Sequence, residues 1–431
     1  MRMTKPTEKI SFSVVGAGNR ADVYLNELLT YYPDKFVVNG VFEPNPERRK
    51  YFQQKYQLKS EQIYDGIADF VKLERISDVV IIATLDDLHY IPAMYALKAG
   101  YDIILEKPIS LTLDETVAIG KEALKYPNQM VAVCHVLRHT PFFSKIKEII
   151  DSKELGEVVN IQHNENVGYF HYVHSYVRGN WRNTEIASPF IVAKSCHDMD
   201  IMLYLLGNKR AKKIASMGEL TYFHHGNYDK TKMAPRCADC SIEPTCPFSA
   251  LKIYGGELIK SVVFNKTTIE TLKADLATSN YGRCVYDMDN DVADHQVSII
   301  EFSDGIHATF NLSAFTEKNH RTIKIMCEKG EIRGISSTQE IQVTPFGQEP
   351  KVIVPKKIKS GHGGGDAGFM INFMESYLSG KEFASTLEKS IESHVMAFAA
   401  EDSRLNGGQV VGIQEFHDKV LKEALDKGLV K

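Results

Sequence analysis

Residues 10–21 read I-S-F-S-V-V-G-A-G-N-R-A, and this stretch decides the fold of the first part of the chain. The apolar run Ile10–Val15 is typical of a β-strand, and the residues from Ala21 to Tyr31 carry leucines at helical spacing. The pattern G-x-G-x-x-A lies between them. In a strand–turn–helix unit the first glycine makes the turn, the second admits a pyrophosphate, and the small third residue lets helix and strand pack closely. The residues of this predicted nucleotide-binding turn are Gly16, Gly18, Asn19, Arg20 and Ala21.

Length and charge limit the possible classes of protein. A chain of 431 residues exceeds one ordinary hydrophobic core and indicates two domains. The net charge of −4, with no basic block, argues against a nucleic-acid partner, because such binding rests on clustered lysine and arginine. The polar start M-R-M-T-K-P has no signal core, and no run approaches the roughly 18 apolar residues that span a membrane. We therefore expect a cytoplasmic protein with a small-molecule partner and no membrane partner.

An acidic residue follows the second predicted strand. The strand Phe36–Phe42 ends at Glu43, about twenty residues after Ala21, where a dinucleotide-binding fold places a carboxylate on the ribose hydroxyls. Glu43 therefore favours NAD over NADP, although the nearby Arg48 leaves NADP open. The alternative for Glu43 is a solvated loop residue.

Two later loops carry further polar side chains. The strand Ser77–Thr84 is a continuous apolar run, typical of a central parallel strand. The strand Tyr101–Leu105 ends in Glu106-Lys107-Pro108, where the proline disfavours a helical conformation at the lysine and should leave it pointing into the crevice. Because loops at the carboxyl ends of parallel strands form the ligand crevice, we expect both loops to face the cofactor. Their candidate side chains are Thr84, His89, Glu106 and Lys107.

Taken together, Gly16-Ala17-Gly18, the Ala83-Thr84 loop with His89, and Glu106-Lys107-Pro108 resemble the Gfo/Idh/MocA family of nicotinamide-dependent oxidoreductases. The resemblance implies a nucleotide-binding domain followed by an α/β domain with a large, open, mostly antiparallel sheet. One face of that sheet would cover the active site, and the other would form a subunit interface in a homodimer or homotetramer. The resemblance also implies that Lys107 lies near the nicotinamide, and that a histidine from a helix of the second domain is the acid/base.

The expected fold class is α/β, with an N-terminal Rossmann parallel sheet and a C-terminal α+β domain with a large open, mostly antiparallel sheet. We place the dinucleotide-binding domain at residues 8–136 and the substrate-binding and oligomerisation domain at residues 137–431. Short alternating segments from Gln296 to Val354 predict antiparallel hairpins. The second domain contains a cysteine-bearing insert at about residues 224–250 and helices at 366–425, which we expect to fold back on that domain.

Residues 188–207, S-P-F-I-V-A-K-S-C-H-D-M-D-I-M-L-Y-L-L-G, predict one long helix that ends at a glycine. Helical spacing lets Lys194 share a face with His197 or with Asp198. In the family resembled, an aspartate commonly precedes the histidine by four residues. That position here is Ala193, which makes Lys194 the expected polar partner of His197.

This helix supplies the expected chemistry. A histidine whose ordinary pKa is near 6.5 can remove a hydroxyl proton at neutral pH, and a lysine on the same oxygen stabilises alkoxide character. We therefore expect His197 to be the acid/base and Lys107 its electrostatic partner, with Lys194 as a third catalytic residue. The alternative is a structural network at the surface.

Two segments predict substrate contacts. Residues 167–183, V-G-Y-F-H-Y-V-H-S-Y-V-R-G-N-W-R-N, combine aromatic faces with arginine and asparagine donors, which suits a sugar ring. The alternative is a packed loop whose aromatic residues serve the core. The glycine-rich stretch S-G-H-G-G-G-D at residues 360–366 lets the backbone approach a ligand, a plain linker being the alternative. The candidate substrate-binding residues are Arg178, Asn180, Trp181, Asp198 and His362.

Seven cysteines in a chain without a signal peptide indicate reduced thiols or metal ligands rather than a disulfide framework. Cys237-x2-Cys240-x5-Cys246 resembles three corners of a tetrahedral zinc site. The fourth ligand would be Cys284, or else His224 or His225, and free loop thiols are the alternative. Such a zinc ion would be structural, since hydride transfer to a nicotinamide needs no metal here.

These features predict an NAD(P)-dependent dehydrogenase or reductase that acts on a secondary hydroxyl of a sugar, polyol or related carbohydrate. One alternative is a glycoside hydrolase that keeps its NAD and cleaves by transient oxidation and elimination. A second is a non-catalytic sugar or redox sensor, against which the presence of Lys107 and His197 argues.

Overall fold

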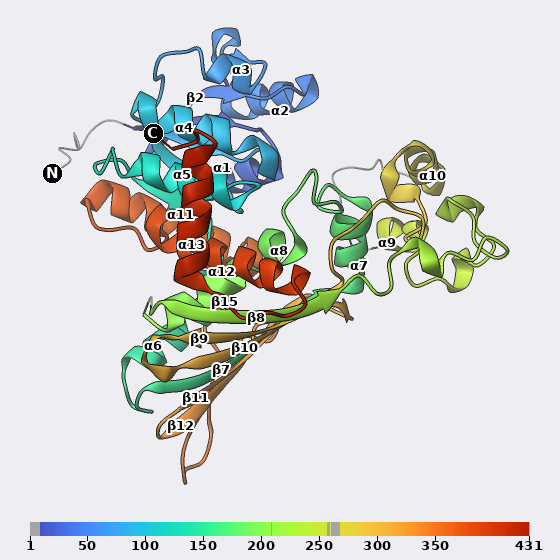
Figure 1. Ribbon diagram of the computed structural model, residues 1–431. Coiled ribbons are helices and arrows are strands. Elements are labelled where there is room, and N and C mark those ends of the chain that lie inside the picture. The colour runs from blue at the N-terminus through green and yellow to red at the C-terminus, as the bar shows by residue number, and fades with distance from the viewer. Residues whose placement is uncertain (1–8, 208, 257–258, 260–267, 431) are drawn as a thin grey trace.

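The computed structural model describes residues 9–207, 209–256, 259 and 268–430. The polar start M-R-M-T-K-P and residue 8, where the predicted first domain begins, lie outside these residues. The described strands form two sheets, one of six strands and one of nine (Figure 1). Within the described ranges, no helix combines the length and apolar character needed to cross a bilayer.

The first sheet is parallel throughout and has the Rossmann strand order β3-β2-β1-β4-β5-β6. Because the strand order reverses at β1, the carboxyl ends of β1 and β4 form the edge where such folds bind ligands. Its strands are β1 (Ile10–Val15), β2 (Phe36–Phe42), β3 (Ile63–Tyr64), β4 (Val79–Ile82), β5 (Asp102–Leu105) and β6 (Val131–Val133).

Helices cover both faces of this sheet. The helices α1 (Asn19–Tyr31), α2 (Pro46–Tyr56) and α11 (Gly361–Ser379) pack on one face, and α3 (Ile67–Phe70), α4 (Tyr90–Ala99) and α5 (Leu113–Ala123) pack on the other. The local signals behave as their chemistry predicts. The side chain of Asn45 caps α2, whose first residue is proline, and Gly100 ends α4 in a left-handed conformation.

The C-terminal helices correct one expectation. They do not fold back on the second domain alone, because Phe369, Phe373 and Met374 of α11 join the core of the first sheet. That face of the sheet is otherwise covered by α1 and α2, and the apolar stripe of α11 completes it. The helices α12 (Leu387–Leu405) and α13 (Ile413–Asp426) contact α5 as well as β8, so they connect the two sheets.

The second sheet is mixed, with the order β14-β13-β12-β11-β7-β10-β9-β8-β15. Only the neighbours β7 and β10 are parallel among its described strand pairs. Its strands are β7 (Val158–Gly168), β8 (Ala211–Glu219), β9 (His295–Phe302), β10 (His307–Thr316), β11 (His320–Cys327), β12 (Gly330–Ile335), β13 (Glu340–Pro345), β14 (Lys351–Ile353) and β15 (Val411–Gly412).

One face of this sheet is covered by helices and the other is open (Figure 1). The side chains of β9 alternate accordingly: Ile300 and Phe302 are buried, whereas Val297 and Ile299 are exposed. The remaining helices are α6 (Pro141–Asp151), α7 (Tyr169–Tyr172), α8 (Phe190–Leu205), α9 (Ala250–Gly255) and α10 (Ile269–Thr278). Of these, α8 lies over the covered face and is buried along most of its length.

The aromatic segment 167–183 is not the predicted loop. Residues Tyr169–Tyr172 form α7, and Val173–Arg178 continue as a π-helical turn. The rings of Tyr172 and Tyr176 pack against Phe190, with centroids 5.0 and 4.5 Å apart. These aromatic residues therefore serve the core, which fixes the start of α8.

The turn after β1 generates a first prediction. Gly16 has a φ of +88°, and a Cβ there would lie 2.8 Å from the Ala83 oxygen and the Thr84 nitrogen. We expect Gly16→Ala to destabilise the protein by about 2–4 kcal/mol, because the left-handed backbone and the clash each have a cost. Urea denaturation measures this loss.

Gly305 provides the matched control, because its φ is +72° and nothing lies within 4 Å of an added Cβ. Gly305→Ala should lose only about 1–2 kcal/mol, the cost of the left-handed conformation. Equal losses in the two variants would contradict the close approach at Gly16.

Candidate active site

The start of α1 lies at the carboxyl ends of β1 and β4, and the crevice at this edge of the parallel sheet is where such folds bind ligands. Gly18 precedes the helix without a side-chain cap, so the first N–H groups of α1 are available to an anion. The Glu43 carboxylate is buried beside the turn, where it accepts hydrogen bonds from Ala17 N at 2.8 Å and Asn45 N at 2.9 Å. The end of β2 thus holds a fixed carboxylate next to the glycine turn.

Two buried polar atoms in this region lack partners. Oγ1 of Thr84 and Nδ1 of His197 have no hydrogen-bond partner in the described structure. Buried polar groups are normally paired, so atoms of this kind are expected where a ligand completes the bonding. Together with the close approach at Gly16 and the uncapped start of α1, they fit a nicotinamide dinucleotide and its substrate.

Arg20 and Glu106 bond to each other and to neighbouring protein groups, and their contact with the cofactor stays a prediction. Arg20 Nε lies 2.7 Å from Glu106 Oε1, and its Nη2 lies 2.9 Å from Asp366 Oδ1 in α11. The other oxygen of Glu106 accepts from Lys107 N at 2.9 Å. Burial acts to raise the pKa of Glu106, but Arg20 and Lys107 hold it below its ordinary value.

His89 also lies against protein groups. Its ring is almost fully buried, with Nδ1 2.8 Å from the Pro108 oxygen and Nε2 3.3 Å from the Thr84 oxygen. The histidine therefore joins the loops after β4 and β5, and its contact with the cofactor stays a prediction.

Lys107 and His197 meet where the crevice reaches α8. Lys107 Nζ donates to the Ala193 oxygen at 2.8 Å, one turn before His197. The His197 ring centroid lies 5.5 Å from that of His135 and 6.2 Å from that of His362. Burial, followed by the charge of Lys107, lowers the pKa of His197 well below 6.5. His197 is therefore a neutral imidazole at neutral pH and can accept a proton.

The crevice also contains an acidic residue that the sequence reading missed. Trp181 Nε1 donates to both carboxylate oxygens of Asp86, at 3.2 and 3.1 Å. Burial raises the pKa of Asp86 against the opposing effects of His89 and Lys107. The position of Asp86 in the loop after β4, at the carboxyl edge of the sheet, is a sequence signal that could have identified it as a site residue. Trp181 thus contacts the loop of the first sheet, whereas Asn180 is exposed.

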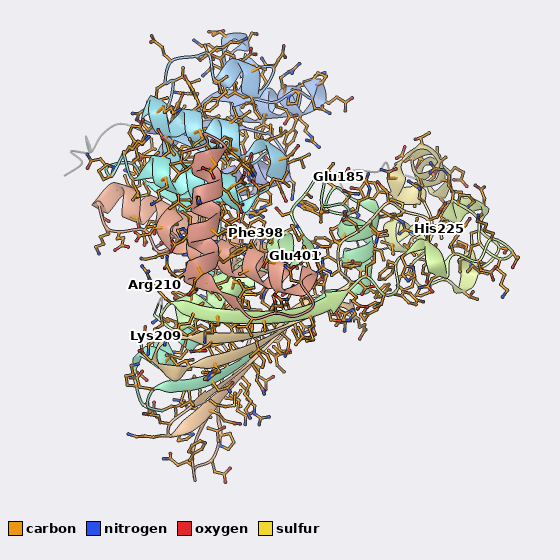
Figure 2. The ribbon with its side chains drawn as sticks, in the orientation of Figure 1. Glu185, Lys209, Arg210, His225, Phe398 and Glu401 are labelled. Carbon is orange, nitrogen blue, oxygen red and sulfur yellow. The ribbon has the colours of Figure 1, made fainter. Side chains whose placement is uncertain are left out.

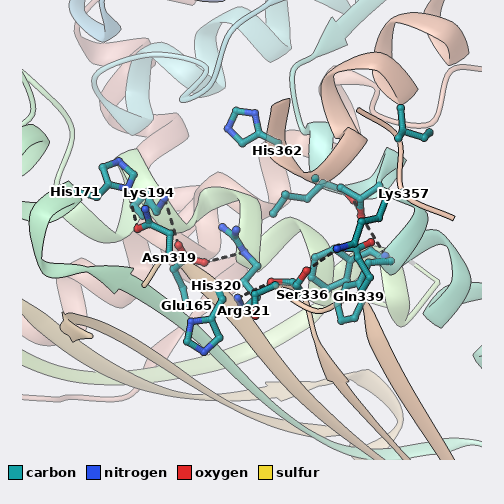
Figure 3. A pocket seen from close by; sticks show the side chains of 17 residues that line it. Glu165, His171, Lys194, Asn319, His320, Arg321, Ser336, Gln339, Lys357 and His362 are labelled. Atoms are coloured by element: carbon teal, nitrogen blue, oxygen red, sulfur yellow. Dashed lines mark hydrogen bonds and ion pairs between the residues drawn. The ribbon is translucent and has the colours of Figure 1, made fainter. Parts of the chain in front are cut away.

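A cavity of about 480 Å³ opens between this crevice and the nine-stranded sheet (Figure 3). Lys194 and His362 are the predicted site residues that line it. His362 has a φ of +50°, and its Nδ1 lies 3.0 Å from Asp366 Oδ1. The lining side chains that the sequence reading missed include Glu165, His171, Asn319, Arg321 and Gln339.

The charged lining forms one network, which changes the roles expected for Lys194 and Asp198. Lys194 Nζ lies 3.3 Å from Glu165 Oε1, so Glu165 and not His197 is its polar partner. Arg321 Nε lies 2.9 Å from Glu165 Oε2 and 2.6 Å from Asp198 Oδ1. Asp198 is fully buried, and it bonds to Arg321 and His163, so it orients the arginine, while its contact with a substrate stays a prediction.

Burial dominates the electrostatics of the lining pair. It raises the pKa of Glu165 against the charges of Arg321 and Lys194, and it lowers the pKa of Lys194 against the charge of Glu165. Both shifts favour the neutral forms of the two side chains.

Arg178 lies elsewhere, which corrects its assignment to the substrate. It is almost fully buried in the segment after α7, where Nε donates to the Arg283 oxygen at 2.8 Å and Nη2 to the Phe248 oxygen at 2.9 Å. The cysteines of the predicted zinc site surround it, and all are free thiols.

Comparisons with known proteins agree with this architecture. Residues 10–135 match the model described as an oxidoreductase family with an NAD-binding Rossmann fold. Residues 147–412 match the C-terminal alpha/beta domain of the same oxidoreductase family. The Bacillus subtilis protein YteT, named as an oxidoreductase, is 23% identical over 377 residues, covering 81% of this chain and 85% of that protein.

Solved structures share the fold at low identity. Levoglucosan dehydrogenase, in complex with NADH and levoglucosan, has a TM-score of 0.69 at 16% identity and covers 94% of this chain and 100% of that chain. An inositol dehydrogenase homolog from Azotobacter vinelandii, in complex with NADH and myo-inositol, has a TM-score of 0.65 at 14% identity and covers 94% and 98%.

Proposed function

The chain belongs to the Gfo/Idh/MocA family of NAD(P)-dependent oxidoreductases, and from this premise we propose that it transfers hydride between NAD(H) and a secondary hydroxyl of a sugar, polyol or related carbohydrate. The observation that carries the proposal is the contact of Lys107 with α8, the helix of the neutral His197, because Lys194 of the same helix lines a cavity with hydrogen-bonding side chains. Levoglucosan and myo-inositol, which accompany two proteins of this fold, support a polyhydroxylated ligand.

In the proposed reaction, the neutral imidazole of His197 accepts the proton of the substrate hydroxyl. Lys107 hydrogen-bonds the same oxygen and stabilises its negative charge as the proton leaves. When bound, the nicotinamide supplies the hydride acceptor for the carbon that bears this oxygen. Lys194 and Glu165, which line the cavity, bind the neighbouring hydroxyls.

The cavity is large enough for a substrate of this class. Small-molecule sites commonly enclose about 300–1,000 Å³, and the cavity of about 480 Å³ can hold a monosaccharide ring. Asn319, Gln339 and the Lys194–Glu165 pair offer donors and acceptors around it. Trp181 lies outside the lining of this cavity, where its indole N–H donates to Asp86 in the loop after β4.

We first predict the effect of removing the acid/base pair. His197→Asn should lower kcat about 10²–10⁴-fold, and Lys107→Met about 10²–10³-fold, because each loses a contact made to the reacting oxygen. Steady-state NADH absorbance with a carbohydrate panel measures this decrease in kcat.

The pH dependence of the wild type gives a separate prediction. Since the pKa of His197 lies below 6.5, kcat for oxidation should stay level as the pH falls from 8 to about 6.5.

The matched control is His307→Asn, which changes an exposed histidine on β10. Its kcat should equal that of the wild type, and NADH binding, followed by fluorescence, should persist in all three variants. Unchanged turnover in both His197→Asn and Lys107→Met would refute the assignment. Cleavage of aryl glycosides without net NADH formation would instead support the hydrolase with retained cofactor.

We propose NAD as the cofactor, with NADP bound more weakly. The Glu43 carboxylate lies beside the turn, and a 2′-phosphate there would meet a negative charge. We expect NAD to bind at least about tenfold more tightly than NADP, and Glu43→Ser to reduce this ratio. Titration with both cofactors measures it, and Glu47→Ser in the exposed first turn of α2 is the control. Tighter NADP binding by the wild type would contradict the role of Glu43.

We also propose that two chains associate through the open face of the nine-stranded sheet. Val297 and Ile299 are 46% and 59% exposed there, on a face without helices. Ile299→Lys should weaken the dimer at least about tenfold, because a charge would be buried in the interface. Light scattering during size exclusion measures the mass, with Leu405→Lys at the end of α12 as the control. A monomeric wild type would contradict the proposal.

A further inference from the structure

The described residues of the segment between β8 and β9, 220–256, 259 and 268–294, form a side module at one end of the nine-stranded sheet. It contains α9 and α10 and extends to the right of the sheets in Figure 1, and His225 marks it in Figure 2. It packs against the nine-stranded sheet, since the rings of Phe223 and of Phe315 in β10 stack with centroids 5.7 Å apart. Four of the seven cysteines belong to this module: Cys237, Cys240, Cys246 and Cys284. The other three, Cys134, Cys196 and Cys327, lie buried on other elements.

Backbone pairing brings the two cysteine-bearing segments together. Cys284 N donates to the Pro235 oxygen at 2.8 Å, and Arg236 forms an antiparallel bridge with Arg283. As a result Cys284 lies beside the Cys237–Cys246 loop, although the two segments are well separated along the chain. All four thiols line one cavity of about 20 Å³, which has room for a single water molecule or ion.

A buried positive charge lies against this cavity. Arg178 is 1% exposed and lines the cavity, and its Nη2 lies 3.4 Å from Cys237 Sγ. Its other contacts are two carbonyl oxygens and the Tyr254 hydroxyl. Among the described residues no carboxylate forms an ion pair with it. A buried cation without a counter-charge is strongly disfavoured, so negative charge is expected nearby.

We propose that this cavity binds one Zn²⁺ ion through the thiolates of Cys237, Cys240, Cys246 and Cys284, with Arg178 as the neighbouring counter-charge. Four thiolates and one Zn²⁺ carry a net charge of −2, which Arg178 reduces to −1, and the four thiol protons pass to solvent. An all-sulfur tetrahedral set is typical of structural zinc and leaves no position open for catalysis.

The four cysteine ligands would take up their tetrahedral arrangement as the ion binds, because the arrangement is not formed beforehand. Within the described parts of the chain, no three His, Cys, Asp or Glu side chains are already arranged as metal ligands. The cysteines lie in a loop and short helical turns, where their side chains can rotate toward the cavity without moving a long helix or a sheet strand. Coupling of binding to local ordering is common for small zinc modules.

The zinc site would also support the crevice. Arg178 ends the π-helical turn, and three residues later Trp181 donates to Asp86 in the loop after β4. An ordered module therefore fixes the segment that carries Trp181. This role is structural and independent of the reaction proposed above.

Metal analysis of the full-length protein tests the site. Mass spectrometry of purified, reduced protein should find about one zinc per chain, released in full by a mercurial thiol reagent. Cys240→Ser should hold less than a fifth of this zinc, because it lacks one of the four ligands. The control Cys327→Ser removes a buried thiol from β11 and should keep all of it.

A second experiment, with Co²⁺ and with Arg178→Met, tests the site even if Cys240→Ser does not fold. Co²⁺ exchanged into the wild type should give the near-ultraviolet sulfur-to-metal absorption of a tetrahedral thiolate site. Arg178→Met should lower zinc affinity about tenfold or more, as loss of a group bonded to a ligand does. Arg182→Met, which breaks the more exposed pair with Asp289, is its control and should leave the affinity unchanged.

Three results would overturn the proposal. They are a reduced wild type that takes up no zinc from added Zn²⁺, a cluster that holds iron instead, and disulfides among these four cysteines in protein purified without oxidant. Each can be found with oxidoreductase activity intact, so failure here is distinguishable from failure of the proposed reaction.

Discussion

Arg20 holds three distant parts of the chain at one point, and the geometry of the site depends on this. Its guanidinium pairs with Glu106 at the end of β5 and with Asp366 at the start of the regular part of α11. Glu106 in turn receives the backbone N–H of Lys107, and Asp366 contacts His362. A buried ion pair contributes little net free energy, but it restricts the arrangement of its partners. The nucleotide turn, the lysine and the glycine-rich loop therefore share one fixed frame.

The sequence predicts the first sheet well because its signals are local. Glycine at a left-handed turn, asparagine before proline at a helix start, and apolar runs in buried strands act within a few residues. The direction of a polar side chain at a strand end, in contrast, depends on contacts with residues far along the chain, which local signals do not predict. Arg20 and His89 occupy positions where a cofactor contact is expected, yet Asp366, far along the chain, and the Pro108 carbonyl take up their donors.

In the second domain the sequence indicated the sheet and the helix of His197 but not the lining of the cavity. Glu165 and Arg321 lie on neighbouring strands, β7 and β11, where their registers place them directly opposite. Charged residues on the covered face of a sheet are costly unless paired, and the pairing is visible only when the strand order is known. The same limit applies to Arg178, whose aromatic surroundings suggested a sugar and whose contacts lie in the cysteine module.

The charge balance of the cavity restricts what it can hold. Glu165 and Asp198 are matched by Lys194 and Arg321 in one network, in which Lys194 pairs with Glu165 and Arg321 pairs with both carboxylates. The network therefore offers directed hydrogen bonds with no net charge, while Lys357 adds a single exposed cation at the rim. An anionic ligand would have to compete with Glu165 for the arginine, and a cation would have to displace Lys194. A neutral polyhydroxylated ring meets neither cost, since its hydroxyls both donate and accept. The electrostatics of the lining thus favour the same substrate class as the position of His197.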